Sequence, residues 1–229
     1  MIHLKLIVTL FVLVVTSAAA QTPPEAVTEI PVEASPVAVP LVQPEPQPQP
    51  ETVKVALQTS LGPILLLIEK ERAPITAGNF LRYVDQKRLD GIGFYRAVKM
   101  GDTGEYGLAQ AGVRGDPKRV LKPIAHEPTT VTGLTHVSGA ISMARLAPGT
   151  ATMEFFIVLG NLPAMDAQPD TQPVQGDNLG YAVFGRVIEG MEVVRAILEQ
   201  PRSATAGEGV MQGQMLETQV KILTARRTE

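Results

Sequence analysis

The chain has 229 residues and carries 20 Lys and Arg against 23 Asp and Glu, a formal net charge of −3. This length allows one large domain or two small ones. The balanced charge gives no sign of the basic stripe that a nucleic-acid-binding surface needs, so we do not expect nucleic acid as a partner. The chain contains no cysteine, which excludes disulfides, thiolate chemistry and anchoring through a lipidated N-terminal cysteine.

Residues 1–20 have the layout of a secretory signal peptide. A short basic start precedes an apolar run from Leu6 to Val15, and Ala18 and Ala20 supply the small residues before a cleavage at Gln21. An N-terminal membrane anchor is the alternative, but the apolar run is shorter than the ~20 residues that span a bilayer. We therefore expect a cleaved signal, no membrane span in the mature chain, and a periplasmic or secreted location.

Residues 21–51 form a segment rich in proline and glutamate. Nine of the 30 residues from Gln21 to Pro50 are proline, and 21–51 carries five glutamates and no base. Such a composition buries too little apolar surface to offset the entropy of ordering, so we expect a disordered, extended tether. It serves either as a plain spacer or as a strip that binds a partner, and the spacer is the simpler interpretation.

Residues 52–229 carry the patterns of a globular domain. Apolar and polar residues alternate from Val53 to Thr59, which predicts a half-buried strand, and a Gly-Pro turn leads into a second strand over 64–68. Thr76 is predicted to cap a helix that ends near Lys87.

The remainder of this domain reads as short strands and one more helix. A helix is predicted over Met191–Leu198 and a last strand over Val220–Leu223. Many short strands with only two helices predict an antiparallel barrel or sandwich. The apolar runs between the helices are Phe94–Val98, Leu108–Ala111, Ala140–Ala144, Phe155–Leu159 and Ala182–Val187.

The common signatures of nucleotide-binding, serine-hydrolase and zinc-peptidase sites are absent from the sequence. After removal of the signal only His126 and His136 remain, and we expect both to be surface or loop residues bonded to backbone. The sequence therefore predicts neither a metal site nor a cofactor.

Five short motifs follow one another along the domain: Phe94-Tyr-Arg96, Leu108-Ala-Gln110-Ala-Gly112, Ile141-Ser-Met-Ala-Arg145, Glu154-Phe-Phe-Ile157 and Tyr181-Ala-Val-Phe-Gly-Arg-Val187. With these motifs in this order, the chain resembles the cyclophilins from about Val53 to Ala225. The resemblance implies a closed, eight-stranded antiparallel β-barrel capped by two α-helices. It also implies a groove that takes an X-Pro segment of a client polypeptide.

The resemblance implies roles for individual residues. Arg96 matches the family's catalytic arginine, and Gln110 matches the glutamine beside it. Strand alternation sends Phe155 inward and Phe156 to the groove, and places Phe94 on the same face as Arg96. The substrate-binding residues implied by the match are Phe94, Leu108, Ala144, Arg145, Phe156 and Tyr181.

The chain also departs from the family's pattern. Glu154 replaces the glutamine that usually precedes the Phe-Phe pair, Gly107 stands where a phenylalanine often lines the pocket, and 100–107 forms an extra loop. The loss of a pocket aromatic would weaken proline binding. These departures are the best support for a holdase chaperone that captures proline segments with little turnover.

The chemistry of the residues favours an isomerase. Rotation about an X-Pro bond needs no nucleophile, acid or metal; it needs a weaker partial double bond, whose barrier is ~18–20 kcal/mol. A guanidinium stays protonated and can donate a hydrogen bond to the prolyl nitrogen as that atom pyramidalises. Because Arg96 and Gln110 are both retained, we expect a monomeric peptidyl-prolyl cis-trans isomerase that acts on exported proteins. A structural envelope protein on a proline stalk is compatible with that activity.

Overall fold

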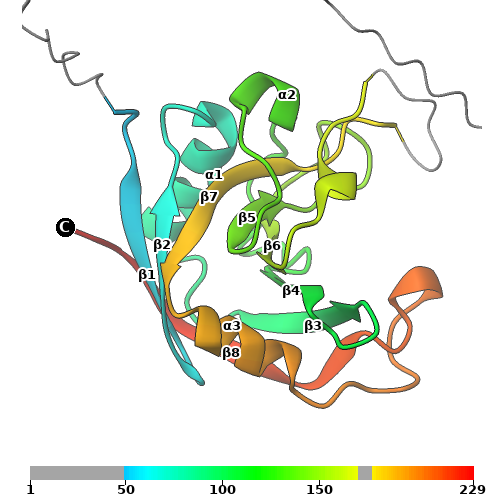
Figure 1. Ribbon diagram of the computed structural model, residues 1–229. Coiled ribbons are helices and arrows are strands. Elements are labelled where there is room, and N and C mark those ends of the chain that lie inside the picture. Colours follow the sequence, from blue (N-terminus) through cyan, green and yellow to red (C-terminus); the bar gives the residue numbers. More distant parts are fainter. Residues whose placement is uncertain (1–48, 170–176) are drawn as a thin grey trace, which may run out of the picture. The chain divides into compact units, whose positions relative to one another are not determined.

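The computed structural model describes residues 49–169 and 177–229. The predicted signal peptide and nearly all of the predicted tether lie outside these residues. The described chain is a closed barrel of eight antiparallel strands in the order β1-β2-β7-β5-β6-β4-β3-β8 (Figure 1), which confirms the predicted fold. Within these residues no helix has the length and apolar character needed to cross a membrane.

The strands are β1 (Val53–Thr59), β2 (Gly62–Ile68), β3 (Gly93–Met100), β4 (Tyr106–Gly112), β5 (Ala140–Met143), β6 (Glu154–Leu159), β7 (Ala182–Glu189) and β8 (Met215–Thr228). The helices are α1 (Pro74–Asp85), the single turn α2 (Thr129–Thr132) and α3 (Met191–Leu198), with 3-10 turns η1 (Pro163–Met165) and η2 (Gly209–Met211). Figure 1 shows α1 and α3 at opposite ends of the barrel. The last strand is much longer than the sequence pattern predicted.

The core of the barrel is built on phenylalanine rings. Phe80 of α1 packs edge-on against Phe155 of β6 with ring centroids 5.6 Å apart, and it lies 5.2 Å from Phe184 of β7. Phe94 of β3 also contacts Phe155 edge-on, with ring centroids 6.0 Å apart. All four rings are fully buried, so α1 is fixed to the barrel through aromatic contacts.

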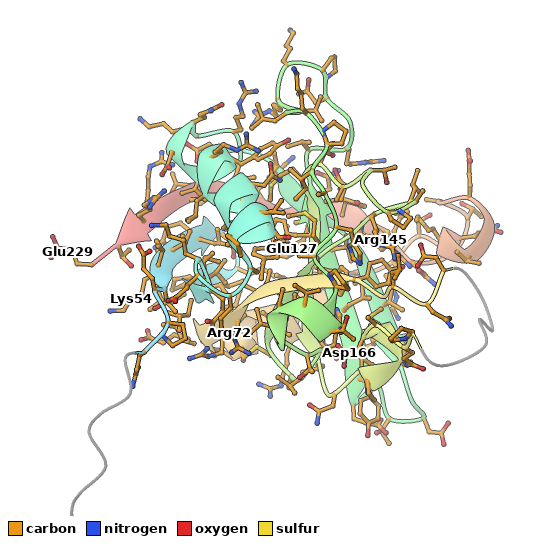
Figure 2. All side chains as sticks on the ribbon, turned by 90° about the horizontal axis from the view of Figure 1, so that it is seen from above. Lys54, Arg72, Glu127, Arg145, Asp166 and Glu229 are labelled. Atoms are coloured by element: carbon orange, nitrogen blue, oxygen red, sulfur yellow. The ribbon has the colours of Figure 1, made fainter. Side chains whose placement is uncertain are left out.

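The start of α1 differs from the prediction. The helix begins at Pro74, a residue whose fixed φ suits a first helical position, and Thr76 is buried inside it, so Thr76 is not the N-cap. The backbone N–H groups of Ile75 and Thr76 instead donate to the carboxylate of Glu127 at 3.1 and 2.6 Å. Figure 2 shows Glu127 beside α1. A side chain about 50 residues away in sequence thus satisfies the first helical donors, which no local pattern can reveal.

Candidate active site

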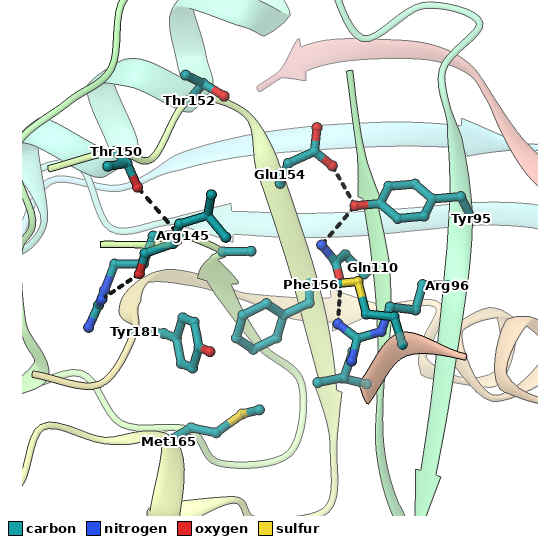
Figure 3. Close-up of a pocket in the computed structure, with 14 residues that line it drawn as sticks. Tyr95, Arg96, Gln110, Arg145, Thr150, Thr152, Glu154, Phe156, Met165 and Tyr181 are labelled. Carbon is teal, nitrogen blue, oxygen red and sulfur yellow. Dashed lines mark hydrogen bonds between the residues drawn. The ribbon is translucent and has the colours of Figure 1, made fainter. Parts of the chain in front are cut away.

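A groove of about 380 Å³ opens on one side of the barrel, and strands β3, β4 and β6 form its floor (Figure 3). Seven of the eight predicted site residues line it, the exception being Phe94. Its lining also includes seven residues that the sequence analysis did not assign to the site: Tyr95, Leu146, Thr150, Thr152, Glu154, Met165 and Met211.

Phe94 is excluded from the groove by a β-bulge in β3. Along the β3–β4 ladder Phe94 pairs with Ala111 and Arg96 pairs with Gln110, so Tyr95 is an extra residue on β3. The bulge breaks the two-residue alternation. The prediction that Phe94 shares a face with Arg96 is therefore wrong: Phe94 lies in the core, and Tyr95 faces the groove.

Arg96 is held in place by two glutamine side chains. Its Nη1 donates to Gln110 Oε1 at 2.8 Å, while its Nε and Nη2 donate to Gln214 Oε1 at 2.8 and 2.6 Å. No carboxylate among residues 49–169 and 177–229 forms an ion pair with it. Three of the five guanidinium N–H groups are used, which leaves two for a ligand.

Partial burial lowers the pKa of Arg96 from the usual arginine value, and the guanidinium still keeps its charge at any physiological pH. Because its protein partners are neutral amides, that charge is not cancelled by a counter-ion beside it. The groove therefore presents a fixed cationic donor next to apolar surface.

Phe156 forms an apolar wall of the same groove. Its ring contacts Tyr181 edge-on at 5.5 Å between centroids and stacks on His136 at 6.0 Å, and Leu108 and Met165 line the same cavity. Phe155 points into the core, so the predicted alternation of the two phenylalanines is confirmed.

The two histidines differ from each other. His126 Nε2 contacts the backbone oxygen of Leu179 at 2.9 Å, as predicted. For His136 the prediction is wrong: the side chain is buried, with Nδ1 2.6 Å from Asp166 Oδ1 and Nε2 2.9 Å from Ser142 Oγ. These partners follow the order of a hydrolase triad, but Ser142 is fully buried and out of reach of any substrate. The arrangement supports the stacked ring of Phe156 from behind.

Arg145 anchors the edge of the groove. It makes a bidentate ion pair with Asp177, both contacts at 2.8 Å, and it donates to the backbone oxygen of Gly180. The pair lowers the pKa of Asp177 to about 2. The guanidinium of Arg145 is thus occupied within the protein, and Ala144 and Arg145 both line the cavity.

The departures from the family pattern have structural consequences. A Cβ on Gly107 would lie 2.3 Å from the backbone oxygen of Val98, so no side chain fits there without backbone movement. The extra loop is the tip of the β3–β4 hairpin, which closes between Met100 and Tyr106. Among the described residues no cluster of three or more potential metal ligands is found.

The comparisons with known proteins agree with this fold. The family described as "Cyclophilin type peptidyl-prolyl cis-trans isomerase/CLD" matches residues 54–227. A peptidyl-prolyl cis-trans isomerase of Acinetobacter baylyi is 32% identical over 65% of this chain and 73% of its own length. One from Streptomyces antibioticus is 36% identical over 62% of this chain and 81% of its own length.

A solved cyclophilin-type isomerase of Cryptosporidium parvum superposes on this chain with a TM-score of 0.58 at 18% sequence identity. The match covers 78% of this chain and 99% of the solved chain, and it supports the fold. The barrel thus has the cyclophilin fold. The chain belongs to the cyclophilin-type peptidyl-prolyl cis-trans isomerases, and it accelerates the isomerisation of X-Pro bonds.

Proposed function

We propose that Arg96 is the catalytic donor of this isomerase and that Gln110 holds it. The observation that carries the proposal is the Arg96 guanidinium, which the side-chain amides of Gln110 and Gln214 hold beside the apolar wall of Phe156. Two of its N–H groups remain for a client. The client proline ring lies against Phe156, Leu108 and Met165. The backbone at Ala144 and Arg145 binds the extended chain before the proline, and Tyr181 closes the edge.

Catalysis then follows from where the donor is aimed. In the planar amide the prolyl nitrogen shares its lone pair with the carbonyl and is a poor acceptor. As the bond twists, the nitrogen pyramidalises and accepts a hydrogen bond from Arg96. An interaction that exists only in the twisted state lowers the barrier without tightening ground-state binding.

We further propose that the protein is exported, is cleaved before Gln21 and works as a monomer on proline-containing segments of other exported proteins. The support is the layout of residues 1–20 and the acidic, proline-rich composition of 21–51. N-terminal sequencing of the protein from an envelope fraction should read from Gln21. Recovery of intact Met1 in a membrane pellet would overturn the proposal of cleavage.

The tether is expected to be dispensable for catalysis, because the residues assigned to the groove all lie beyond Val53. A chain that begins at Thr52 should keep the X-Pro turnover of the mature form and melt at nearly the same temperature. A peptide-isomerisation assay on both forms, with thermal melting, checks this. A large drop in either quantity would mean that 21–51 contributes to the folded domain, and binding without turnover in both forms would favour the holdase alternative.

A further inference from the structure

Four side chains in the groove form one continuous line of hydrogen bonds that ends on Arg96 (Figure 3). The Tyr95 hydroxyl donates to Glu154 Oε2 at 2.6 Å, and Gln110 Nε2 donates to the Tyr95 oxygen at 2.7 Å. Arg96 Nη1 then donates to Gln110 Oε1 at 2.8 Å. The line connects a carboxyl group on β6 to the guanidinium on β3 through two neutral side chains.

The carboxyl group of Glu154 occupies a site that depends on the absence of a neighbouring side chain. Gly112 lies directly opposite Glu154 in the β4–β6 ladder, and a Cβ on Gly112 would lie 2.1 Å from Glu154 Oε2. The other oxygen, Oε1, accepts the backbone N–H of Arg114 at 2.6 Å. Both carboxyl oxygens are therefore held by the protein, and glycine at 112 is what makes room for them.

The direction of each hydrogen bond in this line follows from the charge on Glu154. An ionised carboxylate can only accept, so the single hydroxyl proton of Tyr95 must point toward it. The Tyr95 oxygen then accepts from the amide NH2 group of Gln110, which leaves the amide oxygen facing Arg96. A protonated Glu154 could donate to Tyr95, and Tyr95 could then donate to a flipped amide whose NH2 group faces the donors of Arg96.

We propose that Glu154 and Tyr95 are positioning residues, which fix the orientation of the Gln110 amide and thereby aim Arg96 at the client. The inference rests on the role assigned to Arg96 under the proposed function. Neither residue touches the reacting bond; both act through Gln110. The bulge that places Tyr95 in the groove is the backbone feature that makes the line possible.

The arrangement predicts a loss of activity in acid. Burial raises the pKa of Glu154 above the usual glutamate value, and the hydrogen bonds from Tyr95 and Arg114 oppose this. Because the ionised form holds the productive orientation, turnover is full above that pKa and falls as pH drops through it. Burial also raises the pKa of Tyr95, which keeps its proton throughout. The charged or titratable groups near Glu154 or around the same groove are Tyr83, Tyr95, Arg96, Arg114, Arg145 and Tyr181.

The test compares the mature chain with Tyr95→Phe and Glu154→Gln. Turnover of an X-Pro peptide is measured from about pH 8 down to about pH 5 by NMR exchange between its cis and trans signals, which needs no coupled protease. At neutral pH we expect kcat to fall about tenfold in both variants, the low end of the loss seen when an outer-shell partner is removed at metal sites. KM should change little, and the acid limb of the pH profile should disappear. Exposed matched controls are Tyr106→Phe and Glu217→Gln, which should retain the wild-type profile.

A second measurement does not depend on turnover. In the wild-type chain, the side-chain NMR signals of Arg96 Nε–H and Gln110 NH2 should shift with pH at the same midpoint as kcat, and in Tyr95→Phe they should not. If both variants keep the wild-type kcat and the wild-type loss of activity in acid, the proposal is overturned. The loss in acid would then belong to another group, such as His136, because burial lowers the pKa of that side chain. Activity lost only in step with the melting temperature would overturn it as well. An inactive wild type would instead contradict the proposed catalytic function.

Discussion

Replacing Arg96 with alanine should lower turnover of an X-Pro peptide by about 10²–10³-fold, the loss that follows removal of one transition-state donor. The melting temperature should change little, because Gln110 lines the open groove and Gln214 is partly exposed, so that both amides can bond to water instead. Arg96→Lys should not restore activity. Lysine keeps the charge, but it lacks the planar fork that contacts two amide oxygens at once.

The measurement is peptide turnover together with thermal melting for the wild type and both variants. Arg195→Ala, which removes an exposed arginine from α3, is the matched control and should behave as wild type. If Arg96→Ala retains more than about a third of the activity, far short of the expected loss, Arg96 is not the catalytic donor. If turnover falls only together with the melting temperature, the role of Arg96 is to stabilise the fold, and the holdase alternative is favoured.

Most of the barrel was predictable because its strands alternate regularly. The β1–β2 hairpin and the inward and outward faces of β6 follow the two-residue period, which is a local property of the chain. The Glu127 carboxylate at the start of α1 was not predictable. It reaches the helix through tertiary structure, and the sequence near Thr76 offered a plausible local cap in its place.

In the site, too, features set by local strand patterns were predictable and features set by tertiary structure were not. Residues within strand motifs, such as Gln110 and Phe156, were assigned correctly to the groove, whereas a single bulge exchanged Phe94 for Tyr95. A bulge adds one residue to one strand and leaves no reliable mark in composition or periodicity. Met165 and Met211 come from short 3-10 turns that only the folded chain brings to the cavity.

The two adjacent phenylalanines of β6 allow packing and catalysis to be separated. Phe155 is fully buried against Phe80 and Phe94, so Phe155→Ala should lower the free energy of unfolding by about 3–5 kcal/mol, the usual cost of such a cavity. For a domain of this size each kcal/mol shifts the melting temperature by roughly 2–4 °C. Turnover per folded molecule should stay close to wild type at temperatures where the variant is folded.

Phe156→Ala should give the opposite result. The space it leaves opens to the groove, where water can enter, so the stability cost should be smaller than for Phe155→Ala. The client proline would lose its apolar wall, worth about 1.5–3 kcal/mol for a fully buried side chain, which lowers kcat/KM by roughly 10- to 100-fold. Chemical denaturation and peptide turnover on both variants check the pair. Equal losses of stability, or a larger loss of turnover per folded molecule in Phe155→Ala, would contradict the assignment of Phe156 as the wall that holds the proline ring.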